Sequence, residues 1–354
     1  MTAPVIPATT SPAYSRVPRR RPVSWARLAW VTWRQHRPAL TGAAAFLGVV
    51  SLYLLIMGLA INSAYAKVAS CRPASSGTCQ QLAHSFNAQY WGGGGTGALS
   101  AGGAQTVSSL MLVVPVLLGI FLGAPVLARE FESGTFRFAW TQGCGRLRWA
   151  VSKLVLLAVV ITGVTWAFTE LFSWYYHAFL VDGQVSRLLP LAFGLLGVAF
   201  AAWTLAAFAI AAFFGALIRR TLPAMAATLV TWTVLAIGTA TWLRQHYQAP
   251  LTTTAVNPPS SAWILGSYAT GPDGQVLSQG ALNRLAQQAP ASVQNSPNPS
   301  AFQNWLAQQH YTQWTSYEPA SRFWHFQFIE AGWLVALSSI LIVAAVWLVR
   351  RRAA

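Results

Sequence analysis

Long uninterrupted runs of apolar residues dominate the chain and alternate with shorter polar segments. Because a helix rises about 1.5 Å per residue, roughly 20 apolar residues cross a hydrocarbon layer of about 30 Å. Runs of this length predict six membrane-spanning helices, at 39–61, 107–128, 154–179, 188–218, 222–243 and 328–349. A membrane-spanning β-barrel would show short alternating strands instead of continuous runs. The pattern therefore predicts an all-α polytopic membrane protein.

The fourth run, 188–218, is longer than one crossing requires. The helix that it predicts either tilts, bends near Gly194 and Gly197, or extends beyond the bilayer. These three alternatives leave its ends less defined than those of the other spans.

Composition and charge orient the spans. Of the 354 residues, 55% are apolar and only 8% are charged, and the formal net charge is +16. Lys and Arg gather in alternate segments between the spans, which by the positive-inside rule places both termini and residues 129–153 in the cytoplasm. A nucleic-acid surface would need these bases gathered on one soluble domain, and the sequence has none. We expect a multi-pass protein of the cell (plasma) membrane.

The chain before the first span divides into two parts. Residues 1–23, rich in Pro, Ser and Thr, predict a disordered basic tail. Residues 24–38 predict an interfacial elbow helix, with aromatic and basic side chains on opposite faces. The two faces hold Trp25 and Trp33 and, opposite them, Arg27, Arg34 and Arg37. The alternative for 24–38 is a basic flank that only fixes the topology. In either case, transmembrane helices one to five are predicted within 39–243.

Residues 244–327 predict a small external helical segment between the fifth and sixth spans. The stretch "SQGALNRLAQQAP" predicts one amphipathic helix, and "NPSAFQNWLAQQH" predicts a second with Asn298 as its N-cap. These helices either pack on each other and on the spans or gate a substrate. Residues 328–354 then hold the sixth span and a basic C-terminus.

The cysteines divide by side of the membrane. Cys71 and Cys79 fall in the first external loop, where an oxidising environment favours a disulfide between them, and Cys144 falls in the cytoplasm. The alternative is two free thiols in a flexible loop. A metal site is not predicted, because His84 is the one nearby candidate ligand and no carboxylate accompanies it.

Motifs for catalysis are missing from the sequence. Neither Lys67 nor Lys153 follows a Gly, as the lysine of a phosphate-binding P-loop does. No nucleophile elbow, zinc-protease motif or acid–base pair of carboxylates is found either. We expect this chain to hold no catalytic residue, metal or cofactor, and not to be an enzyme.

Two carboxylates lie within or beside spans, where a charge is costly and often functional. Glu170 falls in the outer half of the third span. Either carboxylate is a substrate contact or a buried partner for Arg187 or Arg322, or it is solvated at the interface beside an aromatic belt, and for Glu170 both alternatives stay open. Glu330 begins the last span at a similar height, and we interpret it as an interfacial, solvated residue.

The second span carries Pro115 and, four residues apart, Gly119 and Gly123. Small residues at this spacing let a neighbouring backbone approach closely, and a proline frees a carbonyl that lines a cavity or is satisfied elsewhere. We expect this span to line a substrate path or to contact another helix or subunit.

The charged segment 129–153 lies between the second and third spans, where it is too short for a domain and too charged for a simple turn. Its "ESGT" at Glu132–Thr135, followed by Arg146 and Lys153, resembles the Glu-x-Gly-Thr…Arg…Lys signature of ABC type-2 exporter permeases. The stretch "PASRFWHFQFIEAGWLVALS" is similar to actinobacterial members of that group. Gly143, Cys144 and Gly145 depart from the Pro-x-Ser that many members have before the Arg.

The resemblance implies a half-transporter. The permease would pair with a second permease, which we expect to be a second copy in a homodimer, and with two ATP-binding subunits that carry the ATP and Mg. Membrane lipids would surround it, and the second and fifth spans would line an export path. Alternatives are a sensor or anchor subunit that moves no substrate, and an enzyme acting on a lipid-linked substrate. The enzyme would depend on an external His or acid: His310, His325, Asp273 or Glu318.

The resemblance also implies that 129–153 couples the spans to the ATP-binding subunit. A short helix beginning at Phe136 would insert apolar side chains into a groove of that subunit, with the charges and Gly134 arranging the turn before it. Arg146 and Lys153 either pair with the acids of this segment or anchor the third span at the headgroups, and for Lys153 we favour the anchor. The coupling residues are then Glu130, Glu132, Gly134, Thr135, Phe136, Ala139, Trp140 and Arg146.

Overall fold

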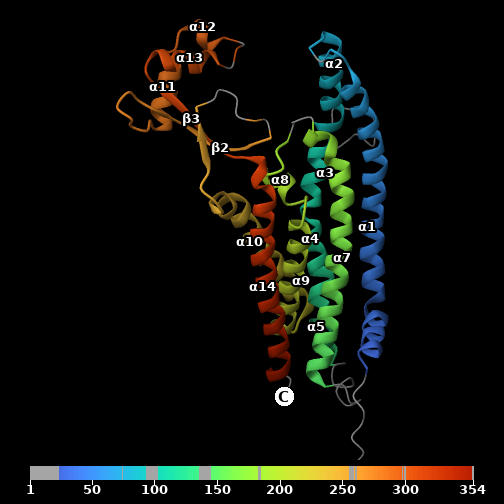
Figure 1. Ribbon diagram of the computed structural model, residues 1–354. Coiled ribbons are helices and arrows are strands. Elements are labelled where there is room, and N and C mark those ends of the chain that lie inside the picture. Colours follow the sequence, from blue (N-terminus) through green and yellow to red (C-terminus); the bar gives the residue numbers. More distant parts are fainter. Residues whose placement is uncertain are drawn as a thin grey trace, which may run out of the picture.

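The fold is a bundle of six long apolar helices with a small domain at one end (Figure 1). This domain, between residues 251 and 318, contains both strands and helices and is called the mixed domain below. The computed structural model describes residues 24–73, 75–92, 103–134, 145–181, 185–254, 259, 261–296, 298 and 300–352. Six helices within these residues are long and apolar enough to cross a membrane, which confirms the predicted spans. Helix α1 begins, and the last helix ends, at the end of the bundle away from the mixed domain (Figure 1).

The spans differ in how continuous they are. The first, third and sixth are single helices, whereas the second, fourth and fifth are divided into shorter pieces. The single helices are α1 (Trp25–Ser70), α7 (Arg146–Val181) and α14 (Phe323–Arg352). The divided spans are α3 (Gly103–Met111), α4 (Val114–Leu118), η2 (Gly119–Gly123) and α5 (Ala124–Ser133); α8 (Pro190–Phe193) and α9 (Ala199–Ile218); and α10 (Thr221–Gly238), η3 (Thr239–Leu243) and η4 (Arg244–His246).

Helix α1 contains both the predicted elbow, 24–38, and the predicted first span. The helix runs without interruption through Pro38, so the elbow is not a separate helix as the sequence suggested. A proline inside a helix removes one backbone hydrogen bond but does not always end the helix. The interfacial position of this part of α1 stays a prediction.

The long fourth run is broken between α8 and α9, in agreement with the predicted bend near Gly194 and Gly197. Gly197 has φ +63°, a left-handed conformation that glycine adopts without strain. The side chain of Gln327, from α14, bridges the break. It accepts hydrogen bonds from the N–H groups of Val198 and Ala199 at 3.0 and 2.8 Å and donates one to Phe193 O at 3.0 Å. Polar backbone groups that the break frees are therefore satisfied inside the bundle.

Helix α9 forms the centre of the bundle. In its most apolar stretch 72% of the residues are buried, against 11% in the fifth span, so α10 is the outermost of the spans. A Cβ added to Gly119 would lie 2.6 Å from Cβ of Ala207, and one added to Gly123 would lie 2.7 Å from Cβ of Ala211. The two glycines therefore let the second span pack directly on α9, an intrachain contact that fits one of the predicted alternatives.

The segment after the fifth span is not purely helical, which corrects the expectation for 244–327. It contains an antiparallel sheet in the order β1-β3-β2, with β1 Leu251–Thr253, β2 Trp263–Thr270 and β3 Thr312–Glu318. Three helices follow β2: α11 (Gln279–Gln288), α12 (Ala291–Gln294) and α13 (Ala301–Gln308). The predicted helices correspond to α11 and α13, but α13 begins at Ala301 with Ser300 in the N-cap position instead of Asn298.

The first loop beyond α1 carries a short helix, α2 (Gly77–Phe86), followed by the π-helical turn η1 (Asn87–Trp91). The structure joins Cys71 to Cys79 by a disulfide, as the sequence favoured. The bridge ties the end of α1 to the start of α2.

Candidate functional site

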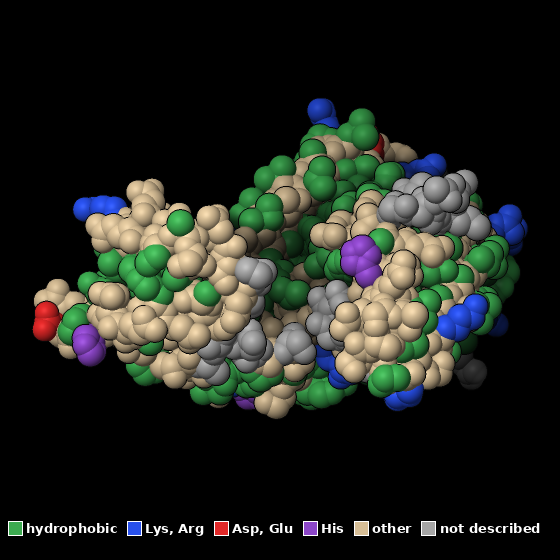
Figure 2. Space-filling model, turned by 90° about the horizontal axis from the view of Figure 1, so that it is seen from above, with side chains coloured by type: hydrophobic (Ala, Val, Ile, Leu, Met, Phe, Trp, Pro, Cys, Tyr) green, Lys and Arg blue, Asp and Glu red, His purple; other side chains and the backbone are tan. Residues whose placement is uncertain are grey.

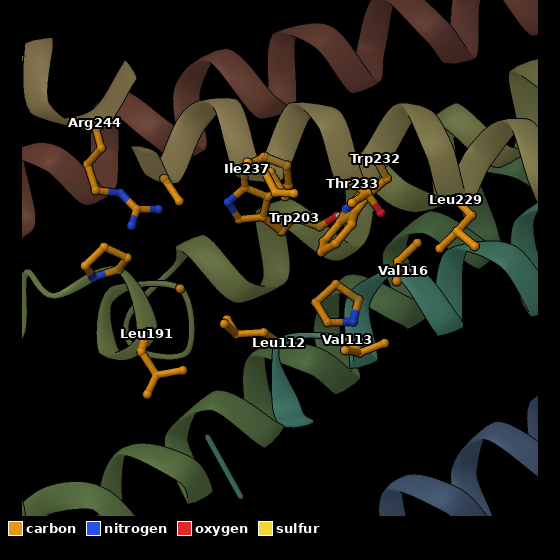
Figure 3. Close-up of a pocket in the computed structure, with 15 residues that line it drawn as sticks. Leu112, Val113, Val116, Leu191, Trp203, Leu229, Trp232, Thr233, Ile237 and Arg244 are labelled. Atoms are coloured by element: carbon orange, nitrogen blue, oxygen red, sulfur yellow. Dashed lines mark hydrogen bonds between the residues drawn. The ribbon is translucent and has the colours of Figure 1, made fainter. Parts of the chain in front are cut away.

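An apolar pocket of about 520 Å³ lies between the second, fourth and fifth spans (Figure 3). This volume is within the range of sites that bind small molecules. Its wall is almost entirely aliphatic and aromatic. The lining residues are Leu112, Val113, Pro115, Val116, Pro190, Leu191, Gly194, Trp203, Leu229, Trp232, Thr233, Ala236, Ile237, Ala240 and Arg244.

Arg244 lies at one end of the group of lining side chains, and Leu229 lies at the other (Figure 3). Arg244 is buried and pairs with Glu330 of α14, which is fully buried. Its Nε donates to Glu330 Oε2 at 3.0 Å and its Nη2 donates to Oε1 at 2.8 Å. This bidentate geometry is the strongest form of an ion pair between side chains.

Two further donors hold the carboxylate of Glu330. Trp203 Nε1 donates to Oε1 at 2.8 Å, and the Tyr247 hydroxyl donates to Oε2 at 3.2 Å. Tyr247 in turn accepts from Trp333 Nε1 at 3.0 Å. Burial of Glu330 corrects the prediction of a solvated interfacial residue, and its partner is Arg244 instead of Arg187 or Arg322.

The guanidinium of Arg244 is fixed from a second side by Phe193. Its Cζ lies 4.1 Å from the centre of that ring, close enough for a cation–π contact. The third guanidinium nitrogen, Nη1, is buried and has no hydrogen-bond partner within the described part of the chain. Arg244 therefore brings an N–H that is unpaired among the described residues to the end of the pocket where its side chain lies.

The other intramembrane candidates fall in different places. Pro115 lines the pocket. Gly119 and Gly123 instead pack on α9. Glu170 is exposed on α7, and no ion pair of it is among those found in the described residues. Arg322, one of its predicted partners, pairs with Glu318.

The opposite end of the bundle holds the start of segment 129–153. Glu130, near the end of α5, forms an ion pair with Lys153 on α7. Lys153 is buried and its Nζ lies 4.6 Å from the centre of the Trp149 ring. Lys153 is therefore held inside the bundle by an acid of the segment, which was the alternative to the favoured anchor at the headgroups and corrects that preference.

Glu132 points to a different helix from Glu130. Its Oε2 accepts from the Thr221 hydroxyl at 2.8 Å and from the Thr221 N–H at 3.3 Å. Thr221 is the first residue of α10, so a carboxylate lies at the positive end of that helix. The C-terminal end of α5 thus contacts the helix that lines the pocket.

The remaining predicted coupling residues either have a described backbone position or lie outside the described part of the chain. Gly134 ends α5 with φ +71°, the left-handed conformation typical of a helix C-terminus. Arg146 begins α7. Thr135, Phe136, Ala139 and Trp140 lie outside the described residues. As for metal ligands, the described residues contain no group of three or more His, Cys, Asp or Glu side chains that could hold an ion.

Six apolar spans with an apolar pocket between three of them define a polytopic membrane protein. A family model described as ABC-2 membrane transporter related matches residues 44–244. The match covers more than half of the chain, so the protein belongs to this family and is the membrane subunit of an ABC transporter, in agreement with the resemblance. Comparison with curated proteins and with solved structures gave no match.

Proposed function

We propose that this chain is the permease of an ABC exporter, in which the pocket belongs to the substrate path and segment 129–153 receives the motion of the ATP-binding subunit. The family supports association with an ATP-binding subunit. The observation that carries the proposal is the hydrogen bonding of Glu132 to Thr221, at 2.8 and 3.3 Å.

This contact supplies a short mechanical link. Glu132 lies where the end of α5 forms the start of segment 129–153, and Thr221 begins α10, which lines the pocket. A shift of the segment therefore moves the first turn of α10 through two hydrogen bonds. Because α10 is the least buried span, it can move at a smaller cost in packing than α9.

The exposed face of α10 suits a second copy of the chain. Large apolar side chains on this helix stand outside the bundle, and an apolar face of this kind packs against lipid or against another helix. These side chains are Leu222, Val230 and Val234, with 77%, 64% and 68% of their surface exposed. In a homodimer built on this face, the two pockets would lie on either side of the contact.

The experiment follows the accessibility of the pocket during ATP turnover. A cysteine introduced as Ala240→Cys on the pocket wall, in a Cys144→Ser background, is exposed to a membrane-impermeant thiol reagent on the external side. The protein is reconstituted with its ATP-binding subunit. For an exporter we expect ATP to increase the labelling several-fold, because the path opens outward.

The link is then tested by adding Thr221→Val, which removes the hydroxyl that Glu132 binds. We expect ATP hydrolysis to continue while the ATP-dependent labelling falls several-fold. Thr241→Val is the matched control, because the Thr241 hydroxyl donates to Ile237 O within the same span at 2.8 Å. Equal ATP-dependent labelling in the Thr221→Val and Thr241→Val proteins would refute the proposed coupling route. Labelling of the parental protein that does not change with ATP would refute the exporter function.

A further inference from the structure

The pocket beside Arg244 is elongated and mostly apolar, with its charged group at one end. Arg244 and Leu229 are 15 positions apart on nearly continuous helix, which corresponds to roughly 22 Å at about 1.5 Å per residue. From the end that carries the sheet, the molecule shows a hollow lined by hydrophobic side chains (Figure 2). A long apolar molecule fits this shape better than a compact polar one.

The polar groups of the pocket wall are mostly engaged. The indole N–H of Trp203 donates to Glu330 and that of Trp232 donates to Trp203 O at 3.3 Å. Arg244 Nη1 differs, because it is buried and lacks a partner among the described residues. A buried N–H of a charged group gains most from an acceptor that reaches it.

The charge of Arg244 is already matched. Glu330 accepts two of its N–H groups, so the pair is neutral as a whole. A ligand anion would bring a second negative charge into an apolar site, where desolvation of an ion is costly. A cationic ligand would be repelled by the positive charge of the guanidinium. An uncharged oxygen acceptor satisfies Nη1 without either cost.

We propose that the pocket binds an uncharged, elongated amphiphile, whose carbonyl-type oxygen accepts a hydrogen bond from Arg244 Nη1 and whose apolar body extends along α10 toward Leu229. The inference rests on the proposed function, since it names the substrate class of the same path. The Trp203 and Trp232 rings, 5.6 Å apart and nearly perpendicular, form the wall against which the apolar body packs.

The test uses four photoreactive probes with the same dodecyl chain, which carries a diazirine. One probe ends in a methyl ester, one in a carboxylate, one in a trimethylammonium group and one in no head group. The full-length protein in lipid nanodiscs is irradiated with each probe at equal content in the bilayer, and labelled peptides are identified by mass spectrometry. We expect the ester to label the pocket-lining peptides about tenfold more than the chain without a head group.

Variants separate the polar contact from the apolar space. The double variant Arg244→Leu with Glu330→Leu removes both charges together, so that neither is left buried alone. It should still bind the apolar chain but lose the preference for the ester. Ala236→Trp fills the pocket and should reduce labelling by all four probes, whereas Ala336→Trp, on the exposed side of α14, should not.

Two results would overturn the assignment: pocket labelling by the carboxylate or the ammonium probe that equals that of the ester, or an ester preference that survives in the double variant. These failures are distinct from failure of the proposed function. The photolabelling needs no ATP-binding subunit, so an ester preference without ATP-dependent opening would refute only the exporter function. ATP-dependent opening without an ester preference would refute only the proposed ligand class.

Discussion

The side-chain oxygen of Gln327 accepts a hydrogen bond from the backbone N–H of Ala199 at 2.8 Å, across 128 positions of sequence. The same side chain serves Val198 and Phe193, so one residue of the sixth span completes the backbone of the broken fourth span. Within a bilayer no water replaces such bonds.

Gln327→Leu should therefore destabilise the bundle. The substitution keeps the apolar volume but leaves the N–H groups of Val198 and Ala199 and the carbonyl of Phe193 unsatisfied. We expect a loss of about 2–4 kcal/mol in the free energy of unfolding. Denaturation in mixed micelles measures it, with Ser339→Leu as the control, since Ser339 is exposed and its hydroxyl donates to Val335 O in its own helix. Equal stability of the two variants would contradict the role of Gln327.

Gly119→Ala tests the contact between the second span and α9. The added Cβ would lie 2.6 Å from that of Ala207, so the helices must separate, at a cost of about 1–3 kcal/mol. The matched control is Gly163→Ala in α7, where a Cβ meets nothing within 4 Å. That change should be neutral or stabilise the helix by up to about 1 kcal/mol. Stability is measured by thermal unfolding. An equal loss of stability in both variants would argue against the close contact.

The Arg244–Glu330 pair should behave as a coupled unit in a double-mutant cycle. Either Arg244→Leu or Glu330→Leu leaves a charge buried alone, and each should cost about 3–5 kcal/mol of stability. The double substitution should restore stability to within about 1 kcal/mol of the parental protein. Additive losses in chemical unfolding would show that the two side chains do not interact.

Glu318 should make the mixed domain sensitive to pH. Burial raises the pKa of its carboxyl above the usual 4.5, while the guanidinium of Arg322, at 2.6 Å, opposes the rise. A raised folded-state pKa favours the fold below the unfolded value, and this contribution is lost as pH rises through the folded-state pKa. We expect protection of β3 amides from hydrogen exchange to fall as pH increases above 4.5.

Glu318→Gln removes the titrating group but can still accept from Arg322. The protection of β3, corrected for the intrinsic pH dependence of exchange, should then lose this slope. An unchanged slope in the variant would assign the pH sensitivity to another group.

The orientation of the bundle can be read with a membrane-impermeant thiol reagent on intact cells. Gln275→Cys, in the exposed loop after β2, should be labelled in a Cys144→Ser background, whereas native Cys144 should not be labelled. The expectation follows from the concentration of Lys and Arg in alternate segments. The reverse pattern would place the mixed domain in the cytoplasm.

The spans could be predicted from the sequence because each depends on local apolar length. Gly119 and Gly123 were also informative, since their spacing in the chain directly sets a helix face. The prediction for Glu330 was wrong because its partner Arg244 lies 86 positions away, and a hydropathy pattern does not show which distant side chains form an ion pair. Arg187 and Arg322 were the partners that the sequence offered, and only the folded structure shows that the side chain of Arg244 reaches Glu330.

The sheet was missed for a related reason. Strand β2 and strand β3 pair across the three helices α11, α12 and α13, and the helical periodicity of those helices gave the stronger local signal. Strand β1 has only three residues, too few for an alternating pattern to be recognised. Likewise Lys153 looks like a headgroup anchor in sequence, and only the nearness of α5 to α7 brings Glu130 to it.

The bridge made by Gln327 has a consequence for the order in which the protein is built. Ribosomes deliver the fourth and fifth spans to the bilayer before the sixth exists. Until then the N–H groups of Val198 and Ala199 lack their acceptor, and Arg244 lacks Glu330. The five earlier helices therefore form an unfinished intermediate, and arrival of the sixth both closes the backbone gap and neutralises the buried cation. Biogenesis of this permease thus ends with a locking step, supplied by its last helix.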